Sequence, residues 1–327
     1  CEGVKGVRFF DHFCLCTDDR EADDILHAGH MNDVVRTAIR SGMDPVTAIK
    51  SATLNTAKEI HIENLGAIAP GYVADMLLVS DLEELKPDLV FFGGRLVAEK
   101  GHMTVPIEAR EYPLEKVNTM YVKDLKTEDF RIKAPVENGT VTVHVMEYTD
   151  LLLSSTELTT ARVPVKDGYV CLEGEDLKFV AVVNRHKGHD TIGLGIVKGF
   201  GTTCGALAST VSHDSHNLTV VYDSAENALM AANALIQCGG GMSAVKDGRL
   251  LHVLELPLAG LISLKDATEL AKDSQVMKEA NRELGLTGLE NPLLRIVTLA
   301  LPVIPKVKMS DLGMVDVLRK ELIPLFV

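Results

Sequence analysis

Two polar stretches of the sequence carry residue types that could do chemistry. In the first, the apolar residues 13–16 end in Thr17 and then in Asp18, Asp19 and Arg20. Such a run is typical of a buried strand, and a carboxylate at a strand's exit can bind a metal ion or move a proton. An ordinary strand-to-loop junction with a solvated Asp-Asp-Arg cluster explains the same residues equally well.

Two histidines follow these carboxylates. His27 and His30 lie three residues apart around Gly29, which predicts a turn near Asp18. A single histidine is more often structural than a ligand. Two beside a carboxylate cluster indicate a binding role as readily as a structural one.

The second stretch is His213-Asp214-Ser215-His216-Asn217, just before an apolar run at 218–222. Two neutral imidazoles with a carboxylate between them could bind a divalent metal or hydrogen-bond a polar heterocycle. On a helix the two histidines would share a face, whereas on a strand they would point to opposite sides. Because so polar a cluster is costly to leave unpaired beside apolar runs, we favour a functional role.

Two further segments are weaker candidates. Residues 185–189, Arg-His-Lys-Gly-His, could reach the same place, but a solvated loop is the simpler interpretation. The glycines at 193, 195, 199 and 201 fit neither GxGxxG nor the Walker Gly-Lys-Ser/Thr pattern. Tight turns or close backbone approach explain them better than phosphate binding.

The composition limits the classes of function. The chain has 327 residues, a net charge of −13 and 46% hydrophobic residues, as expected of a globular protein with two or three cores. Its acidic excess argues against a nucleic-acid or anionic-membrane partner. No apolar run approaches the ~20 residues of a membrane span. The first ten residues are charged and mixed, so we expect no signal peptide.

The six cysteines, at 1, 14, 16, 171, 204 and 238, match neither a CxxC pair nor a zinc knuckle. We expect reduced, mostly buried thiols in a cytosolic protein, with Cys14 and Cys16 on one face of the strand. The chain starts at Cys1, without an initiator Met, and reaches its best strand within 13 residues. We therefore expect a fragment of a longer protein.

Helices and a small β unit must position the first stretch. The periodicity predicts a helix over 31–41, capped by Asn32 and ended by Gly42, and a second from Asp44-Pro45 to about Ala57. From residue 65 the period changes to that of strands, predicted at 76–79, 89–92 and 95–98. Gly93-Gly94 predicts the hairpin turn between the last two, and Asp75 a local hydrogen bond at the start of the first.

Strands and helices alternate after an irregular, charged connection at 106–135. Strands are predicted at 141–145, 179–183, 218–222 and 250–254. Asp223 with Glu226 predicts a capping box for a helix that ends at Gly239, and Ser263 with Asp266 predicts the start of another. The pattern is that of an α+β domain.

Together these residues resemble the adenine deaminases of the amidohydrolase superfamily, over almost the whole chain. The segment 65–71 with Ala74-Asp75 occurs in many amidohydrolases, while the block 213–217 with its surrounding domain is specific to adenine deaminases. The other matching motifs are Cys16-Thr17-Asp18-Asp19-Arg20, His27-Ala28-Gly29-His30, Asp44-Pro45-Val46-Thr47-Ala48-Ile49, Ala52-Thr53-Leu54-Asn55, Gly205-Ala206-Leu207-Ala208-Ser209, Gly239-Gly240-Gly241 and Ala300-Leu301-Pro302-Val303-Ile304-Pro305.

The resemblance implies an α/β plus α+β architecture. Residues 1–57 would be the last strand and helices of a metal-dependent (β/α)₈ barrel, 58–118 a small β-sandwich portion, and 119–327 the C-terminal α+β domain. It also implies deamination of adenine to hypoxanthine and ammonia, in cytoplasmic purine salvage. Mn or Fe in a binuclear centre and a homo-oligomer belong to the same expectation.

The resemblance also assigns roles to residues. Asp18 would be the metal ligand of the last barrel strand and take a proton from the attacking hydroxide. Asp19 would hydrogen-bond the purine or fix Asp18. The expected substrate-binding residues are His30, His213, Asp214 and His216.

Two departures from the family pattern matter. Glu21-Ala22 stands where many relatives carry His-Pro, and the His-x-His pair, later histidines and Glu of the barrel are absent. A whole barrel takes about 250 residues, and one parallel strand cannot bury both of its faces. We therefore expect residues 1–57 to complete a barrel supplied by another chain or a missing segment, and this chain alone not to deaminate adenine.

Two alternatives stay open. One is another amidohydrolase acting on a cyclic amide or amidine, such as a cytosine- or dihydroorotate-type hydrolase, although those relatives lack the third unit. The other is a non-catalytic binding or regulatory fragment.

Overall fold

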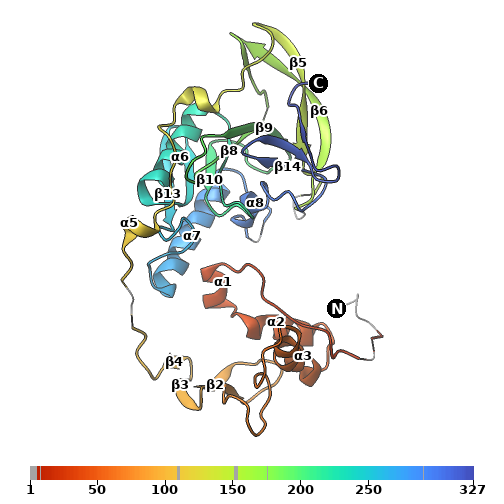
Figure 1. Cartoon of the computed structure of the whole chain (residues 1–327), viewed down its shortest axis with the longest axis vertical. Helices are drawn as coiled ribbons and strands as arrows, with labels where there is room; N and C mark the ends of the chain where they lie inside the picture. The colour runs from red at the N-terminus through yellow and green to blue at the C-terminus, as the bar shows by residue number, and fades with distance from the viewer. Residues whose placement is uncertain (1–5, 8, 109–110, 151–153, 175, 290) are drawn as a thin grey trace. The chain divides into compact units, whose positions relative to one another are not determined.

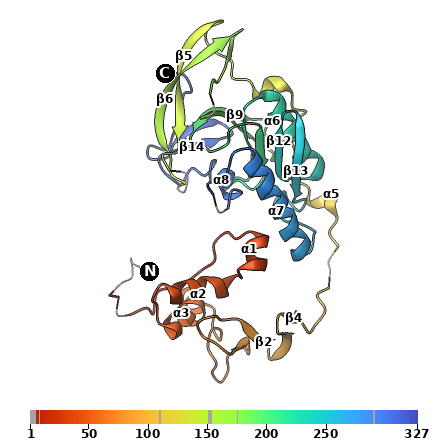
Figure 2. The ribbon, with the colours of Figure 1, turned by 180° about the vertical axis from the view of Figure 1, so that it is seen from behind.

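The computed structural model describes residues 6, 7, 9–108, 111–150, 154–174, 176–289 and 291–327, so Cys1 lies outside the described residues. The chain divides into two compact units, Cys1–Glu111 and Tyr112–Val327, and each is described by itself (Figure 1; from behind, Figure 2). Within the described ranges, no helix has both the length and the apolar character to cross a membrane.

Four short helices begin the first unit: α1 Ala22–His27, α2 Met31–Arg40, α3 Pro45–Ala52 and α4 Leu54–Glu59. The predicted cap of α3 is confirmed, since the Asp44 carboxylate accepts from the Thr47 backbone N–H at 2.9 Å. The predicted single helix from 44 to 57 is wrong, because it breaks at Thr53, whose hydroxyl donates to the Ile49 carbonyl at 2.7 Å.

The end of α2 is also confirmed, whereas its predicted cap is not. Gly42 follows the helix with φ of +98°, the conformation that favours glycine after a helix end. The N-cap residue is His30 rather than Asn32. The Asn32 side chain instead accepts from the His30 backbone N–H at 2.9 Å and so bends the chain into the helix.

The predicted strand at 13–16 is wrong, because residues 13–18 have no regular secondary structure. Phe13 and Leu15 pack on the apolar core that Val35, Ala38 and Ala48 form between α2 and α3. The Leu15 N–H donates to the Ser51 carbonyl at 3.0 Å. A parallel strand needs neighbouring strands, and the described residues provide none for this segment. The apolar run therefore reflects packing against helices.

One antiparallel sheet completes the first unit, in the order β1 Met76–Val79, β2 Pro87–Phe92, β3 Arg95–Glu99 and β4 His102–Met103. The Gly93-Gly94 turn is confirmed, with φ of +55° and +77°. The local role of Asp75 is confirmed too, since its carboxylate accepts from the Gly93 N–H at 2.7 Å. A sandwich needs a second sheet. Among the described residues of this unit there is only the one, so the sandwich portion is not confirmed.

A nine-stranded sheet forms the centre of the second unit. Its order is β13-β12-β10-β11-β8-β9-β5-β6-β7, and all neighbours are antiparallel except β5 and β9. The four predicted strands are confirmed, and β11 agrees residue for residue. The strands are β5 Gly139–Glu147, β6 Glu157–Lys166, β7 Tyr169–Val170, β8 Leu177–Val183, β9 Ile192–Lys198, β10 Ala206–Ser209, β11 Leu218–Tyr222, β12 Gly241–Lys246 and β13 Arg249–Glu255.

Helices cover both faces of this sheet. Along β8, Val180 and Val182 face the core that holds α7 (Ala267–Glu283) and α8 (Leu294–Val297). The alternate residues, Ala181 and Val183, face the core that holds α6 (Ala225–Cys238). This alternation is the two-residue period of a strand buried on both faces. The domain is thus α+β, as predicted.

Both helices of this unit were predicted, but Ser263 lies outside the cap of α7 and the cap of α6 differs from the prediction. Asp266 caps α7, accepting from the N–H groups of Thr268 and Glu269 at 2.9 Å each, and Gly239 ends α6 with φ of +88°. The predicted capping box is wrong, because the N-cap of α6 is Ser224. Asp223 accepts instead from the Gly205 N–H and so ties the start of β10 to the start of α6.

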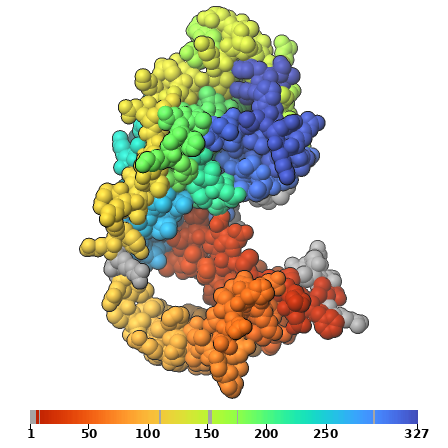
Figure 3. Space-filling model, viewed as in Figure 1, coloured from red at the N-terminus to blue at the C-terminus, as the bar shows by residue number. Residues whose placement is uncertain are grey.

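Short elements begin and end the sequence of this unit. They are α5 Leu114–Val117, the 3₁₀ helix η2 Thr127–Phe130, β14 Val307–Ser310, β15 Gly313–Asp316 and β16 Glu321–Ile323. A Cβ on Gly193, in β9, would lie 2.0 Å from the Ser310 carbonyl oxygen, which confirms a close backbone approach at this glycine. The C-terminal residues, blue in Figure 3, lie against yellow-green β5 and β6, where Val143 bridges to Phe326.

The cysteines that the structure describes are all free, as predicted, but they are not mostly buried. Four of the five are half-buried, and Cys16 is exposed. The reason for Cys16 is that its segment is not inside a sheet but lies at the surface of the helices.

Candidate functional site

The histidine loop, residues 212–217, connects β10 to β11 in the second unit. It is neither helix nor strand, and His216 takes φ of +51°. The rings of His213 and His216 nevertheless meet, with centroids 5.3 Å apart and planes at 81°. Both rings are half-buried, while Asp214 is exposed beside them. The loop therefore brings the two imidazoles together although it is neither a helix nor a strand.

Hydrogen bonds within the loop fix the state of the His216 ring. The Ser212 backbone N–H donates to Nδ1 at 3.2 Å, and the His216 N–H donates to the Ser212 carbonyl at 2.7 Å. Because Nδ1 accepts, the neutral ring carries its hydrogen on Nε2. Burial lowers the pKa of His216, as do the charges of His213, Arg185 and His186, against the opposing effect of Asp214. At pH 7 this ring is thus a neutral donor.

The segment after β8 also reaches this loop. Arg185 is 1% exposed, and its Nε donates to the His216 carbonyl at 2.5 Å. His186 Nε2 donates to the Ser215 carbonyl at 2.7 Å. The interpretation of 185–189 as a solvated loop is therefore wrong for its first two residues. The signal that could have found them is their place two and three positions after the four buried residues that end β8.

Asp18 lies in a turn of the first unit. It is exposed, takes φ of +53°, and its Oδ1 accepts from the Asp19 N–H at 2.8 Å. This conformation is uncommon for a non-glycine residue, although aspartate adopts it more readily than most. The Asp18 carboxylate is thus held by the backbone of its neighbour and stays exposed.

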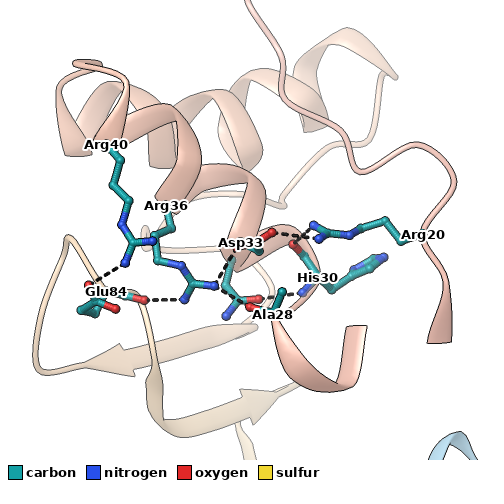
Figure 4. A network of polar contacts seen from close by, with 8 residues as sticks. Arg20, Ala28, His30, Asp33, Arg36, Arg40 and Glu84 are labelled. Atoms are coloured by element: carbon teal, nitrogen blue, oxygen red, sulfur yellow. Dashed lines mark hydrogen bonds and ion pairs between the residues drawn. The ribbon is translucent and has the colours of Figure 1, made fainter. Parts of the chain in front are cut away.

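Arg20 connects this turn to α2, as Figure 4 shows. Its guanidinium donates to Asp33 at 2.8 Å and to the His30 carbonyl at 3.5 Å, and Arg36 donates to the other Asp33 oxygen at 2.8 Å. Burial alone would raise the pKa of Asp33, but the hydrogen bonds and charges of both arginines hold it below its usual value. Arg20 is therefore a partner of Asp33 and anchors the Asp18 turn.

The two histidines of the first unit have different positions. His30 begins α2, its ring is exposed, and its backbone joins the Arg20 network. His27 Nδ1 lies 2.7 Å from the Asp23 carbonyl within one helical turn, which is a structural contact. The predicted turn is present at Gly29, with φ of +116°.

The predicted site residues thus form two groups. Asp18, Asp19 and His30 belong to the first unit, and His213, Asp214 and His216 to the second. The histidine loop brings the rings of His213 and His216 together, whereas His30 is linked to the Asp18 turn through its carbonyl and Arg20.

A metal centre needs several donors around one point. In the part of the chain that the structure describes, no group of three or more His, Cys, Asp or Glu side chains could hold a metal ion. Asp18 offers one exposed carboxylate. The described residues do not by themselves fit a metal centre.

Two protein-family models match this chain, one in each unit. Residues 154–321 match the model of the adenine deaminase C-terminal domain, and residues 2–97 match that of the amidohydrolase family. The histidine loop lies inside the first match, and Asp18 inside the second.

Individual relatives agree with these matches. The chain is 42% identical to the adenine deaminase of Moorella thermoacetica over 314 residues, covering 95% of this chain and 52% of that protein. It is 39% identical to the adenine deaminase of Geobacillus kaustophilus, covering 95% and 54%. For the adenine deaminase of Bacillus velezensis the identity is 40%, covering 96% and 54%. The chain therefore spans about half the length of the curated relatives it matches.

Proposed function

Because the chain belongs to the adenine deaminase C-terminal domain family, we propose that it contributes half of an enzyme that hydrolyses adenine to hypoxanthine and ammonia. The observation that carries the proposal is the histidine loop, which lies within the family match and holds two neighbouring imidazoles. We propose residues 1–57 as the end of a barrel, 58–118 as a β-sandwich portion and 119–327 as the C-terminal domain.

The histidine loop has the polarity that a purine requires. Adenine offers ring nitrogens that accept hydrogen bonds and an amino group that donates them. The neutral His216 ring carries a donor at Nε2, and the exposed Asp214 carboxylate is an acceptor. We assign His213, Asp214 and His216 to substrate binding on this ground, with His213 packing edge-on against His216.

In the first unit we assign Asp18 as one ligand of a divalent-metal centre, Asp19 as the residue that fixes Asp18 or bonds the purine, and His30 as a substrate contact. The bond from the Asp19 N–H to Asp18 supports the pairing of the first two. Mn or Fe in a binuclear centre is part of the proposal. The other ligands would come from the half of the relatives that this chain does not span, so we derive no catalytic step through the metal.

The wider setting belongs to the same proposal: purine salvage in the cytoplasm by a homo-oligomer, with no nucleic-acid or membrane partner. The net charge of −13 supports the last point, since both partners prefer basic surfaces. The free cysteines are consistent with a reducing compartment.

Complementation tests the proposal. The chain is purified alone, and also together with the part of the Moorella thermoacetica adenine deaminase that it does not span, with Mn added. We expect hypoxanthine to form only in the mixture and to be lost when the chain carries Asp18→Asn. A stable mixed complex without turnover would favour the non-catalytic binding fragment. Turnover of a cyclic amide but not of adenine would favour another amidohydrolase.

A further inference from the structure

Arg185, the second residue after β8, is a buried arginine at the base of the histidine loop. Its guanidinium reaches acceptors on three separate segments: the His216 carbonyl at 2.5 Å, the Ala259 carbonyl at 3.0 Å, and the hydroxyl and carbonyl oxygens of Thr119. Burial lowers its pKa to about 10, so it stays charged at pH 7. A charged group so deeply buried needs this set of partners.

Backbone bonds tie the segment of Thr119 both to Arg185 itself and to the segment of Ala259. The Tyr121 N–H donates to the Arg185 carbonyl at 2.9 Å, and the Ala259 N–H donates to the Val117 carbonyl at 3.0 Å. Gly260 lies against the guanidinium, and a Cβ there would be 3.1 Å from Arg185 Nη1. The surroundings of Arg185 are therefore closed by backbone, which leaves its planar fork little freedom.

The histidine loop is held at two successive carbonyls by two successive residues. Arg185 Nε donates to the carbonyl of His216, and His186 Nε2 donates to the carbonyl of Ser215. Both donors follow within three residues of the end of β8, a strand that pairs with β11 on one side and β9 on the other. The loop backbone is thus fixed to a rigid element just where the two imidazoles stand.

We propose that Arg185 is the positioning residue of the histidine loop: its fork holds the loop backbone so that His213 and His216 present their rings together to the purine. The inference rests on the proposed function of that loop. Arg185 does not itself contact the substrate. A lysine could keep the charge but could not bond three segments in one plane.

The histidine ring signals of the full chain test this without substrate. In histidine-labelled protein, NMR titration follows His213 and His216, assigned with His213→Gln and His216→Gln. We expect Arg185→Lys and Arg185→Met both to raise the pKa of His216 toward its ordinary 6.5, because a released loop loses burial. Thr119→Val, which removes one partner of Arg185, should shift it less, in the same direction, and covers the case that the Arg185 variants do not fold.

A matched control is Lys308→Met, which removes another fully buried cation of the same unit and should leave both histidine signals unchanged. Unchanged signals in all the folded Arg185 and Thr119 variants would overturn the proposal. A shift of the His216 pKa in Arg185→Met but not in Arg185→Lys would also overturn it, because the charge of Arg185 rather than its planar fork would then be responsible.

Turnover in the complemented enzyme separates this inference from the proposed function. We expect Arg185→Lys to raise KM for adenine by roughly tenfold with kcat little changed, as expected for a displaced binding group. If the wild-type mixture is inactive while the histidine signals still move, the proposed function fails and the positioning role stands. If the wild-type mixture is active and Arg185→Lys alters neither signals nor KM, the positioning role fails alone.

Discussion

At the scale of single residues, the tautomer of the His216 ring is set by the hydrogen bond that its Nδ1 accepts. Because Ser212 donates to Nδ1, the ring has one hydrogen left to give, at Nε2. We expect His216→Ala to raise KM for adenine in the complemented enzyme roughly 3- to 10-fold, the worth of one net hydrogen bond. His216→Gln should lose less, because its amide can donate. Equal losses in two folded variants would argue against a donor role.

Lys308 is a buried amine whose surroundings include no carboxylate among its described contacts. Its Nζ donates to the Ser154 carbonyl at 2.5 Å, and burial, with the charge of Arg295, lowers its pKa from 10.5 to about 8. Between these two pH values the unfolded chain binds more protons, so this lysine makes stability rise with pH from 8 to 10.5.

The prediction for Lys308 is therefore a pH-dependent difference between two proteins. Lys308→Met should be more stable than the wild type below pH 8, by on the order of 3 kcal/mol, and the gap should close as the pH approaches 10.5. Urea unfolding of both proteins at pH 7.5 and pH 10 measures the difference. A gap that is constant with pH would contradict the titration of Lys308.

At this scale the sequence predicted residue types better than residue partners. Asp75 was placed correctly, and Asp266 of the predicted Ser263–Asp266 pair does cap its helix, because a local acceptor acts on N–H groups a few positions away or across one hairpin turn. Arg20 and Arg185 were not, because their partners are Asp33, Thr119 and Ala259, which only the fold brings near. Spacing along the chain carries no information about such contacts.

At the scale of elements, the cap of α7 is the most direct test of a local signal. Asp266 accepts two backbone N–H groups of the first turn, at 2.9 Å each. We expect Asp266→Ala to lower the free energy of unfolding by about 1 kcal/mol. Ser263→Ala, three residues earlier and outside the cap, should change it far less. Similar losses in both would mean that the cap contributes nothing specific.

Strands were predicted where alternating or apolar runs were long, as in β8 and β11. They were missed where small residues dominate: β10 reads Ala-Leu-Ala-Ser, and β9 has two glycines, Gly193 packed against backbone and Gly195 against the Met309 side chain. The opposite error occurred at 13–16, where an apolar run packs on helices instead of pairing with strands. Apolar runs report burial, and only neighbouring strands decide whether a buried segment becomes part of a sheet.

At the scale of the whole molecule, the chain divides into two units near residue 111. The described residues of 106–113 are exposed or irregular, whereas the second unit has its own sheet and cores. We expect limited proteolysis to cut within 106–113 and to leave a stable fragment that begins near Tyr112. Mass spectrometry of the digest identifies it. Cuts that first appear inside the nine-stranded sheet would contradict this division.

The family was predictable because many motifs over the whole chain agreed, and the family match at 154–321 confirms it. The metal centre was less predictable. A binuclear site collects ligands from several strands, and one carboxylate in this chain cannot show how the others are placed.

The pairing of the C-terminal residues with β5 has a consequence for synthesis of the protein. The Val327 N–H donates to the Thr142 carbonyl at 3.1 Å, and the His144 N–H donates to the Leu325 carbonyl at 2.8 Å. A ribosome adds ~5–20 residues per second, so these C-terminal partners of β5 are made roughly 10 to 40 seconds after β5 itself. During that interval an edge of a long apolar strand is open to pairing with other nascent chains. A lower expression level, which reduces the concentration of nascent chains, together with abundant chaperone should therefore raise the yield of soluble protein.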